Sequence, residues 1–256
     1  MTLTAEEEAR WQAAKDRVIT LDPKVRDGIG VQKEKTLHAV LKNYYEPDRA
    51  FQEVPVGPFI ADILRGGAVT EIQTANMIHM RDKLSFMLKE HDVRIVYPIP
   101  HKKWVVWLDP ESGLPVKKNK SPYTGTFYQA FRELFWIDMY LGNPRLTIDL
   151  LLIDLEEYRF LDGWGTGGKR GSHRFDQLPL SIEGRLVLKS PSDYNYFLPD
   201  TLPSPFTSKD LAAAAGVKRQ SVVYSSILKI LTDIGTVSRV GKKGNAYLYT
   251  KGSSAS

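Results

Sequence analysis

The amino-acid sequence predicts an α/β (α+β) protein whose core consists of one helix, three strands, a second helix and a fourth strand. Three observations support this fold class. Apolar residues recur at helical spacing in residues 32–45 and 76–91. Glycine and proline turn signals divide residues 51–74 into three short strand-like segments. Residues 93–98 are compactly apolar, which is typical of a buried parallel strand reached by a helical crossover, so we expect a mixed sheet.

Each element of this core has its own signal. The apolar face of the first helix follows the spacing i, i+3, i+4, i+7 and consists of Leu37, Val40, Leu41 and Tyr44. The three strand-like segments are residues 51–56, 59–65 and 68–74. Gly57-Pro58 separates the first two, and Gly66-Gly67 is a tight hairpin signal between the second and third. Beyond residue 98 the patterns predict a strand at 102–108, a polar loop at 109–121, an amphipathic helix at 126–141, a strand at 146–158, a glycine-rich loop at 162–171 and a short strand at 186–188.

The composition changes after the proline-bearing segment 199–205. The patterns there predict a helix at 208–215 capped by Ser208, a helix at 218–234, and strands at 236–240 and 246–250. A helix-turn-helix followed by a hairpin with a basic tip is the winged-helix pattern. The predicted organisation is an appendage at 1–30, a main domain at 31–198 with its core motif at 32–98 and an extension at 99–198, and a winged helix at 199–256.

Charge and composition restrict the class of protein. The 256 residues are 42% hydrophobic and 25% charged, as in an ordinary globular protein, and the absence of cysteine excludes disulfides and thiolate metal sites. The net charge is +5, and residues 201–251 alone hold eight basic and two acidic residues. We expect nucleic acid to be the partner of that segment. No apolar stretch is long enough for a membrane span and no signal peptide is recognisable, so we expect a cytoplasmic, nucleoid-associated protein.

Polar residues interrupt two of the predicted core strands. Asp62 lies within an apolar strand, where a carboxylate is costly to bury unless it is paired or bound to a cation. Glu71 and Gln73 share one face of the next strand, because side chains alternate along a strand. The hairpin at Gly66-Gly67 folds Glu71 back towards Asp62. Two carboxylates then suit Mg²⁺ or Mn²⁺, with the backbone carbonyl of Ile72 as a further oxygen ligand.

The order of elements, with Asp62 on the second strand and Glu71-Ile72-Gln73 on the third, resembles the PD-(D/E)XK (restriction-endonuclease-like) nuclease superfamily. The resemblance covers about 65 residues and implies a metal-dependent nuclease with Asp62 and Glu71 as metal ligands. Gln73 would position the water, and Glu34 on the first helix would act in the outer shell or at a second metal. The usual residue at position 73 is lysine, and Gln73 carries no charge. The chain also looks similar to uncharacterised bacterial proteins that share the EIQT stretch and a C-terminal helix-turn-helix.

Basic and polar residues of the C-terminal unit are the expected DNA contacts. The second helix begins with Lys218, Arg219, Gln220 and Ser221, and the hairpin tip carries Lys242 and Lys243. Lys169 and Arg170 form the basic tip of the glycine-rich loop. We expect duplex or branched DNA as the partner; a homodimer would suit double-strand cleavage, although nothing in the sequence requires one.

Several alternatives stay open at the level of the sequence. Asp62 would be a structural acid if it were paired with Arg65 or Lys83. The protein would then be a catalytically inactive DNA-binding or regulatory protein with a nuclease fold, or an assembly module whose winged helix binds protein. Histidine metal sites are not expected from spacing, because the five histidines have no metal-like arrangement in the sequence: His38, His79, His91, His101 and His173.

Overall fold

The computed structural model describes residues 3–19, 35–164, 170–218 and 223–252. Its main feature is a mixed sheet of seven strands, to which a separate two-stranded sheet is added at the C-terminus. Within the described residues, no helix is both long and apolar enough to cross a bilayer. The predicted α/β fold class is therefore confirmed at the level of a mixed sheet flanked by helices.

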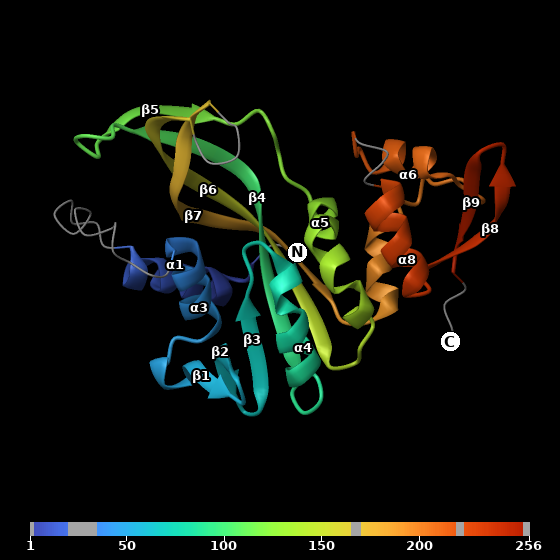
Figure 1. The fold of residues 1–256 in the computed structure, drawn as a ribbon, viewed down its shortest axis with the longest axis horizontal. Coiled ribbons are helices and arrows are strands. Elements are labelled where there is room, and N and C mark those ends of the chain that lie inside the picture. Colours follow the sequence, from blue (N-terminus) through green and yellow to red (C-terminus); the bar gives the residue numbers. More distant parts are fainter. Residues whose placement is uncertain (1–2, 20–34, 165–169, 219–222, 253–256) are drawn as a thin grey trace.

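The seven strands follow the order β1-β2-β3-β4-β6-β7, with β5 paired to β4 at one end. Strands β3, β4 and β6 are parallel to one another, and the remaining pairs are antiparallel. The strand bounds are β1 Gln52–Val56, β2 Phe59–Arg65, β3 Ala68–Ile72, β4 Val93–Leu108, β5 Pro115–Lys120, β6 Leu146–Trp164 and β7 Arg170–Leu188. β4, β6 and β7 are far longer than the others and form an arm that runs beyond the end of β3 (Figure 1).

Helices cover both faces of this sheet (Figure 1). On one side lie α1 (Ala5–Val18) and α3 (Thr36–Tyr45), which bury Trp11 and Leu41 against Val96 and Leu151. On the other side lie α4 (Arg81–Met87) and α5 (Phe131–Leu134), each continuous with 3-10 turns. These turns are Met77–Met80 before α4, and Phe127–Ala130 and Phe135–Tyr140 around α5. The parallel strands β3, β4 and β6 are thus covered on both faces where these helices lie, which explains the near-continuous apolar residues there.

The predicted order of the core, helix–strand–strand–strand–helix–strand, is confirmed in residues 36–96. β3 ends at Ile72, two residues before the predicted end, since the chain turns away after its last pairing with β4. The predicted helix at 76–91 is a 3-10 turn followed by the short helix α4. The predicted helix at 126–141 consists of the short helix α5 between two 3-10 turns.

β4 corrects the prediction of two separate strands at 93–98 and 102–108, because it is continuous through Pro98 and Pro100. The physical reason lies in its neighbours. The pairing of β4 with β3 ends at Val96, and its pairing with β5 begins at Trp104. Between these positions no strand of the described residues pairs with that edge of β4, so the missing N–H of each proline removes no hydrogen bond from the ladder.

Two other strands lie where the sequence predicted otherwise. β5 lies in the predicted polar loop at 109–121. All six of its residues are exposed, so its strand conformation is stabilised by its pairing with β4 and not by burial. β7 extends far beyond the predicted strand at 186–188 and pairs with β6 along an edge of the sheet, where Pro179 is tolerated. The predicted glycine-rich loop at 162–171 is shorter, because β6 continues to Trp164 and β7 begins at Arg170; residues 165–169 lie outside the described residues.

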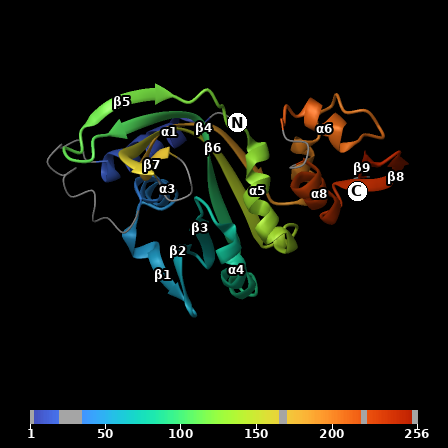
Figure 2. The same cartoon turned by 45° about the horizontal axis from the view of Figure 1, so that its top comes forward.

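The C-terminal unit contains α6 (Ser208–Ala214), a π-helical turn (Val223–Leu228), α8 (Lys229–Asp233) and the hairpin of β8 (Val237–Lys243) and β9 (Ala246–Lys251). The N-cap of α6 is Thr207, whose side chain and that of Asp210 form a capping box, and not Ser208 as the sequence predicted. In Figures 1 and 2 the unit lies beyond α5. Its apolar side chains belong to the same buried cluster as those of α5: Phe206, Leu211, Ile227 and Ile230 with Phe131 and Leu134.

Candidate active site

The hairpin of β2 and β3 brings the two predicted acids together. Gly66 and Gly67 form its turn with φ values of 59° and 81°, a conformation that glycine adopts without strain. The register pairs Ile63 with Thr70, so Asp62 and Glu71 are the next opposing residues along the two strands. The hairpin that the sequence predicted therefore positions both carboxylates at the same end of the β2–β3 pair.

The carboxylates continue the ladder in place of backbone carbonyls. The N–H of Ile72 donates to Oδ2 of Asp62 at 2.7 Å, and the N–H of Asp62 donates to Oε1 of Glu71 at 3.3 Å. Each acid thereby binds the backbone of the opposite strand, which fixes the two side chains relative to each other. Within the described residues, Oδ1 of Asp62 has no hydrogen-bond partner.

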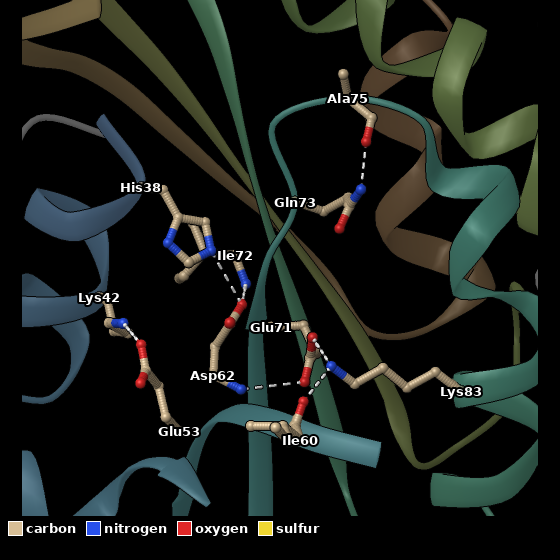
Figure 3. A network of polar contacts seen from close by, with 10 residues as sticks. All are labelled: His38, Lys42, Glu53, Ile60, Asp62, Glu71, Ile72, Gln73, Ala75 and Lys83. Carbon is tan, nitrogen blue, oxygen red and sulfur yellow. Dashed lines mark hydrogen bonds and ion pairs between the residues drawn. The ribbon is translucent and has the colours of Figure 1, made fainter. Parts of the chain in front are cut away.

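Two side chains from the flanking helices complete the site (Figure 3). His38 of α3 places Nε2 3.3 Å from Oδ2 of Asp62. Lys83 of α4 places Nζ 2.5 Å from Oε2 of Glu71 and donates to the carbonyl of Ile60 at 2.6 Å. Helices from the two faces of the sheet thus supply one basic group to each acid.

These contacts show whether Asp62 is paired with Arg65 or Lys83, as the structural alternative required. Arg65 forms its ion pair with Glu46 at 2.7 Å and does not pair with Asp62. Lys83 pairs with Glu71. The direct partners of the Asp62 carboxylate are therefore His38 and the backbone N–H of Ile72. Neither His38 nor Lys83 was among the predicted site residues, because each reaches the site from another element.

The electrostatic environments of the two acids differ. Burial raises the pKa of Glu71 to about 7; the charge of Asp62 adds to this rise and Lys83 opposes it. Burial alone would also raise the pKa of Asp62, but His38 and the N–H of Ile72 outweigh burial and leave that pKa below its usual value. Of the two close carboxylates, Glu71 is therefore the one whose ionised form is disfavoured.

The oxygen donors of the two carboxylates fit a divalent cation, which would also favour the ionised form of Glu71. Mg²⁺ prefers oxygen ligands and uses one or two carboxylates together with water. Asp62 is 22% exposed at its side chain, and its Oδ1 is available among the described residues, whereas Glu71 is almost fully buried. Asp62 and Glu71 could both hold the ion if the ammonium group of Lys83 moved away from Oε2 of Glu71.

Gln73 does not point at the carboxylates in this structure. Its side-chain amide donates to the carbonyl of Ala75, and its backbone N–H donates to Val96 at 2.9 Å (Figure 3). The chain turns here through Asn76, whose φ of 58° lies in the left-handed region that asparagine tolerates better than most residues. Ile72 contacts Asp62 through its backbone N–H. The carbonyl of Ile72, which was the predicted metal ligand, takes no part in the contacts described for the site.

The structure leaves some predicted residues undescribed. Glu34, Lys169, Arg219, Gln220 and Ser221 lie outside the described residues, and so does the side chain of Arg170, the first residue of β7.

The remaining predicted DNA contacts are on the surface of the C-terminal unit. Lys218 is exposed after α6. Lys242 and Lys243 are the last residues of β8 and not part of the turn, which is Gly244-Asn245. Arg239 stacks on the ring of Tyr247 at 3.0 Å from its centroid, and Lys242 lies 4.8 Å from the same ring. The hairpin therefore presents an ordered basic surface.

Comparisons with known proteins show which part of the chain matches a family. The family described as "domain of unknown function (DUF8091)" matches residues 35–189, which is more than half of the chain and contains the site. An uncharacterized protein of Treponema pallidum (strain Nichols) is 27% identical over 224 residues, a length that covers 87% of each protein. No solved structure matches.

Proposed function

Because the chain belongs to the DUF8091 family, whose description assigns no activity, we propose its function from the geometry of the site: a metal-dependent nuclease that hydrolyses phosphodiester bonds of DNA. The observation that carries the proposal is the arrangement of Asp62 and Glu71 on adjacent strands, bound to each other's backbone, with Lys83 against Glu71. Carboxylates placed in this way suit a divalent ion and a phosphate substrate.

The order of elements around the site supports the same class of enzyme. Helix α3, strands β1, β2 and β3, helix α4 and strand β4 follow the order of the restriction-endonuclease-like core, and the two acids lie on its second and third strands. The departure from the PD-(D/E)XK pattern is Gln73. It lacks the charge of the usual lysine, and its side chain is turned towards the carbonyl of Ala75 and away from the carboxylates.

Mg²⁺ or Mn²⁺ held by Asp62 and Glu71 would lower the pKa of a bound water and neutralise negative charge on the scissile phosphate. The residues of the chain have separate tasks. Asp62 accepts the N–H of Ile72 and keeps its carboxylate fixed at the edge of β3. His38 holds the same carboxylate from the side of α3. The site is thus preorganised before a substrate binds, which is what an electrostatic catalyst requires.

Lys83 is the residue that we propose in place of the lysine missing at position 73. Its ammonium group lies at Glu71 and is only partly exposed, so its charge is weakly screened by water. A fixed ammonium group here stabilises the ionised form of Glu71 and can stabilise charge that develops on a phosphate. A lysine on the helix after β3 supplies the same charge as a lysine on β3.

The C-terminal unit supports DNA as the polymer. Two helices followed by a basic hairpin have the arrangement of a winged helix, and residues 201–251 carry an excess of six positive charges. In winged helices the second helix and the hairpin contact bases and phosphates. Lys218, Lys242 and Lys243 are the described residues that we expect to bind phosphates. Arg219, Gln220 and Ser221, which follow Lys218 in the sequence, are expected contacts as well.

A second candidate is a catalytically inactive DNA-binding or regulatory protein that keeps the nuclease fold. One observation favours it: each carboxylate already has a basic partner from the chain, His38 for Asp62 and Lys83 for Glu71. Such pairing could stabilise the site without any metal. The two candidates differ in a measurable way, because only the first requires divalent ions.

The test measures cleavage of supercoiled, linear, single-stranded and branched DNA by the purified protein in Mg²⁺, Mn²⁺ or EDTA. Loss of a group that only supports a metal ligand already costs about 10- to 100-fold, so we expect Asp62→Asn and Glu71→Gln to lower cleavage by at least about 100-fold. Both variants should retain DNA affinity, measured in EDTA, and a wild-type circular dichroism spectrum. Asp92→Asn, at an exposed acid beside β4, is the matched control and should cleave normally.

Two outcomes would contradict the nuclease. Cleavage that persists in both site variants would assign the activity to other residues or to a contaminant. DNA binding without cleavage under every metal condition would leave the inactive DNA-binding protein as the function.

A further inference from the structure

A second group of metal-ligand side chains lies on the arm, away from the site described above. His101 of β4, Asp154 of β6 and Glu183 of β7 each offer one ligand atom, and these atoms all lie within 4.8 Å of one another. Glu71 pairs with Ile95 of β4, and His101 is six residues further along that strand, which corresponds to about 20 Å of extended chain. The two sites are therefore separate.

Irregularities in two adjacent strand pairs create this group. Between β4 and β6 the register shifts from Pro100 paired with Ile153 to Lys103 paired with Leu155, which leaves two residues of β4 opposite Asp154. Between β6 and β7 the register shifts from Leu152 paired with Gly184 to Ile153 paired with Ile182, which leaves Glu183 as the extra residue. Bulges re-aim side chains and are common beside functional sites. Here a bulge on either side directs His101 and Glu183 towards Asp154.

The contacts within the group fit a shared cation. Nδ1 of His101 is 2.8 Å from Oδ1 of Asp154, which also accepts the N–H of Lys102 at 2.9 Å. The ammonium group of Lys102 is 3.7 Å from Oδ2 of Asp154, and the hydroxyl of Ser181 donates to Glu183 at 2.6 Å. With a neutral imidazole, two carboxylates face one lysine, so the group has a net negative charge.

The distances also allow an ion to enter with small side-chain movements. Two ligand atoms about 2.0 to 2.1 Å from a tetrahedral zinc are about 3.3 Å apart. The observed separation of 2.8 Å between His101 and Asp154 would have to increase by about 0.5 Å, and the exposed Glu183 can rotate. Asp154 is buried and fixed by the Lys102 N–H, whereas His101 and Glu183 provide access from solvent.

We infer that His101, Asp154 and Glu183 form a second divalent-metal site, selective for a transition metal such as Zn²⁺ over Mg²⁺. The imidazole decides the selectivity, because nitrogen ligands suit Zn²⁺ and Co²⁺, whereas Mg²⁺ prefers oxygen ligands in octahedral geometry. Three protein ligands leave a further coordination position for water or for a substrate group. The site does not depend on the proposed nuclease activity, since it shares no residue with Asp62 and Glu71.

The test uses the full chain, freed of metal, and Co²⁺ as a spectroscopic probe. The background is the double variant Asp62→Asn/Glu71→Gln, so that binding at the first site does not contribute. We expect one equivalent of Co²⁺ to give visible absorption bands, and Zn²⁺ to displace Co²⁺ while millimolar Mg²⁺ does not. His101→Ala and Glu183→Gln in this background should each weaken Co²⁺ binding at least about 10-fold.

His79→Ala is the matched control, because His79 is an exposed histidine outside the group and its loss should leave Co²⁺ binding unchanged. Glu183 is exposed, so its substitution tests the site even if His101→Ala lowers stability. Unchanged affinity and spectrum in both His101→Ala and Glu183→Gln would overturn the inference. So would the absence of Co²⁺ binding at 100 equivalents, which would leave His101 and Asp154 as a hydrogen-bonded pair only.

Discussion

Lys83 is the side chain that links the electrostatics of the site to its proposed chemistry. It is 16% exposed and holds a carboxylate that is 4% exposed, so the pair is mostly removed from water. Removing one partner of a buried pair leaves an uncompensated charge. Without Lys83, Glu71 would face Asp62 with no positive charge of its own, and protonation of Glu71 would become more favourable.

We therefore expect Lys83→Met to lower the cleavage rate by about 100-fold or more, because removal of one preorganised donor to charge that develops in a transition state typically costs a factor of about 10² to 10³. The same change should lower the free energy of unfolding by up to about 3 kcal/mol at pH 8, because Glu71 then has to keep an unpaired buried charge or take up a proton. Cleavage assays and urea unfolding measure the two effects.

Lys83→Arg is the control, because it keeps the positive charge. It should retain more of the cleavage rate and more of the stability than Lys83→Met. Equal loss of cleavage in the two variants would argue against a role of the charge.

Part of the site could be predicted from the sequence. Asp62 and Glu71 could be placed together, since a two-glycine hairpin signal fixes which residues oppose each other. The contacts of His38 with Asp62 and of Lys83 with Glu71 could not; the sequence named Lys83 only as a possible partner of Asp62, and both contacts depend on how α3 and α4 cross the sheet. The direction of Gln73 could not either, since it depends on where β3 ends and on the left-handed backbone at Asn76.

At the scale of elements, the β2–β3 hairpin determines the site more than any single contact does. A slip of one residue in its register would move every side chain of β3 to the opposite face. The turn that prevents such a slip needs positive φ at both of its residues, Gly66 and Gly67. Neither position is crowded, since no atom lies within 4 Å of a Cβ added at either glycine.

Substitutions at Gly66 test this turn by backbone conformation alone. Gly66→Val should lower the free energy of unfolding by roughly 1 to 2 kcal/mol or more, because a β-branched residue is strained at positive φ. Gly66→Asn should be much better tolerated, since asparagine adopts the left-handed region most readily after glycine. Urea unfolding measures the difference. Equal stability of the two variants would show that the turn does not require this conformation.

The elements that the sequence predicted well are those with one buried face or a glycine turn. The elements it missed lie at edges. β5 follows β4 directly in a hairpin, but all six of its residues are exposed, so it lacks the alternation of buried and exposed residues that would have predicted a strand. β4 and β7 contain prolines, which locally oppose a strand; those of β4 lie where its pairing with β3 has ended, and Pro179 of β7 lies at a register shift in an edge strand.

On the scale of the whole molecule, the C-terminal unit and the sheet share a buried core. Ile227, Ile230 and Leu231 pack in the same cluster as Leu134 and Ile137. Lys229 of α8 adds an ion pair to Asp138, at the edge of this contact. The basic hairpin is therefore fixed relative to α5 by apolar packing, and DNA bound there would have a defined orientation relative to the sheet.

The salt dependence of DNA binding tests whether the hairpin is the contact surface. Each phosphate that loses its lysine partner should lower the slope of log affinity against log salt by about 0.9. We expect Lys242→Ala/Lys243→Ala to lower the slope by about 1 to 2, with a uniform loss of affinity across DNA sequences. Fluorescence anisotropy in EDTA measures it. Lys89→Ala/Lys189→Ala removes two exposed lysines elsewhere and should leave the slope unchanged; equal slopes in the two variants would exclude the hairpin as the contact.

The position of Trp11 has a consequence for the order in which the chain folds during synthesis. Trp11 is fully buried, and its indole N–H donates to the carbonyl of Leu180, which follows it by 169 residues. At about 5 to 20 residues per second, a ribosome needs roughly 10 to 30 s to make the intervening chain. During that time α1 leaves the ribosome without the strand that buries its tryptophan. The final burial of Trp11 and its hydrogen bond to Leu180 can therefore form only after β7 has been synthesised.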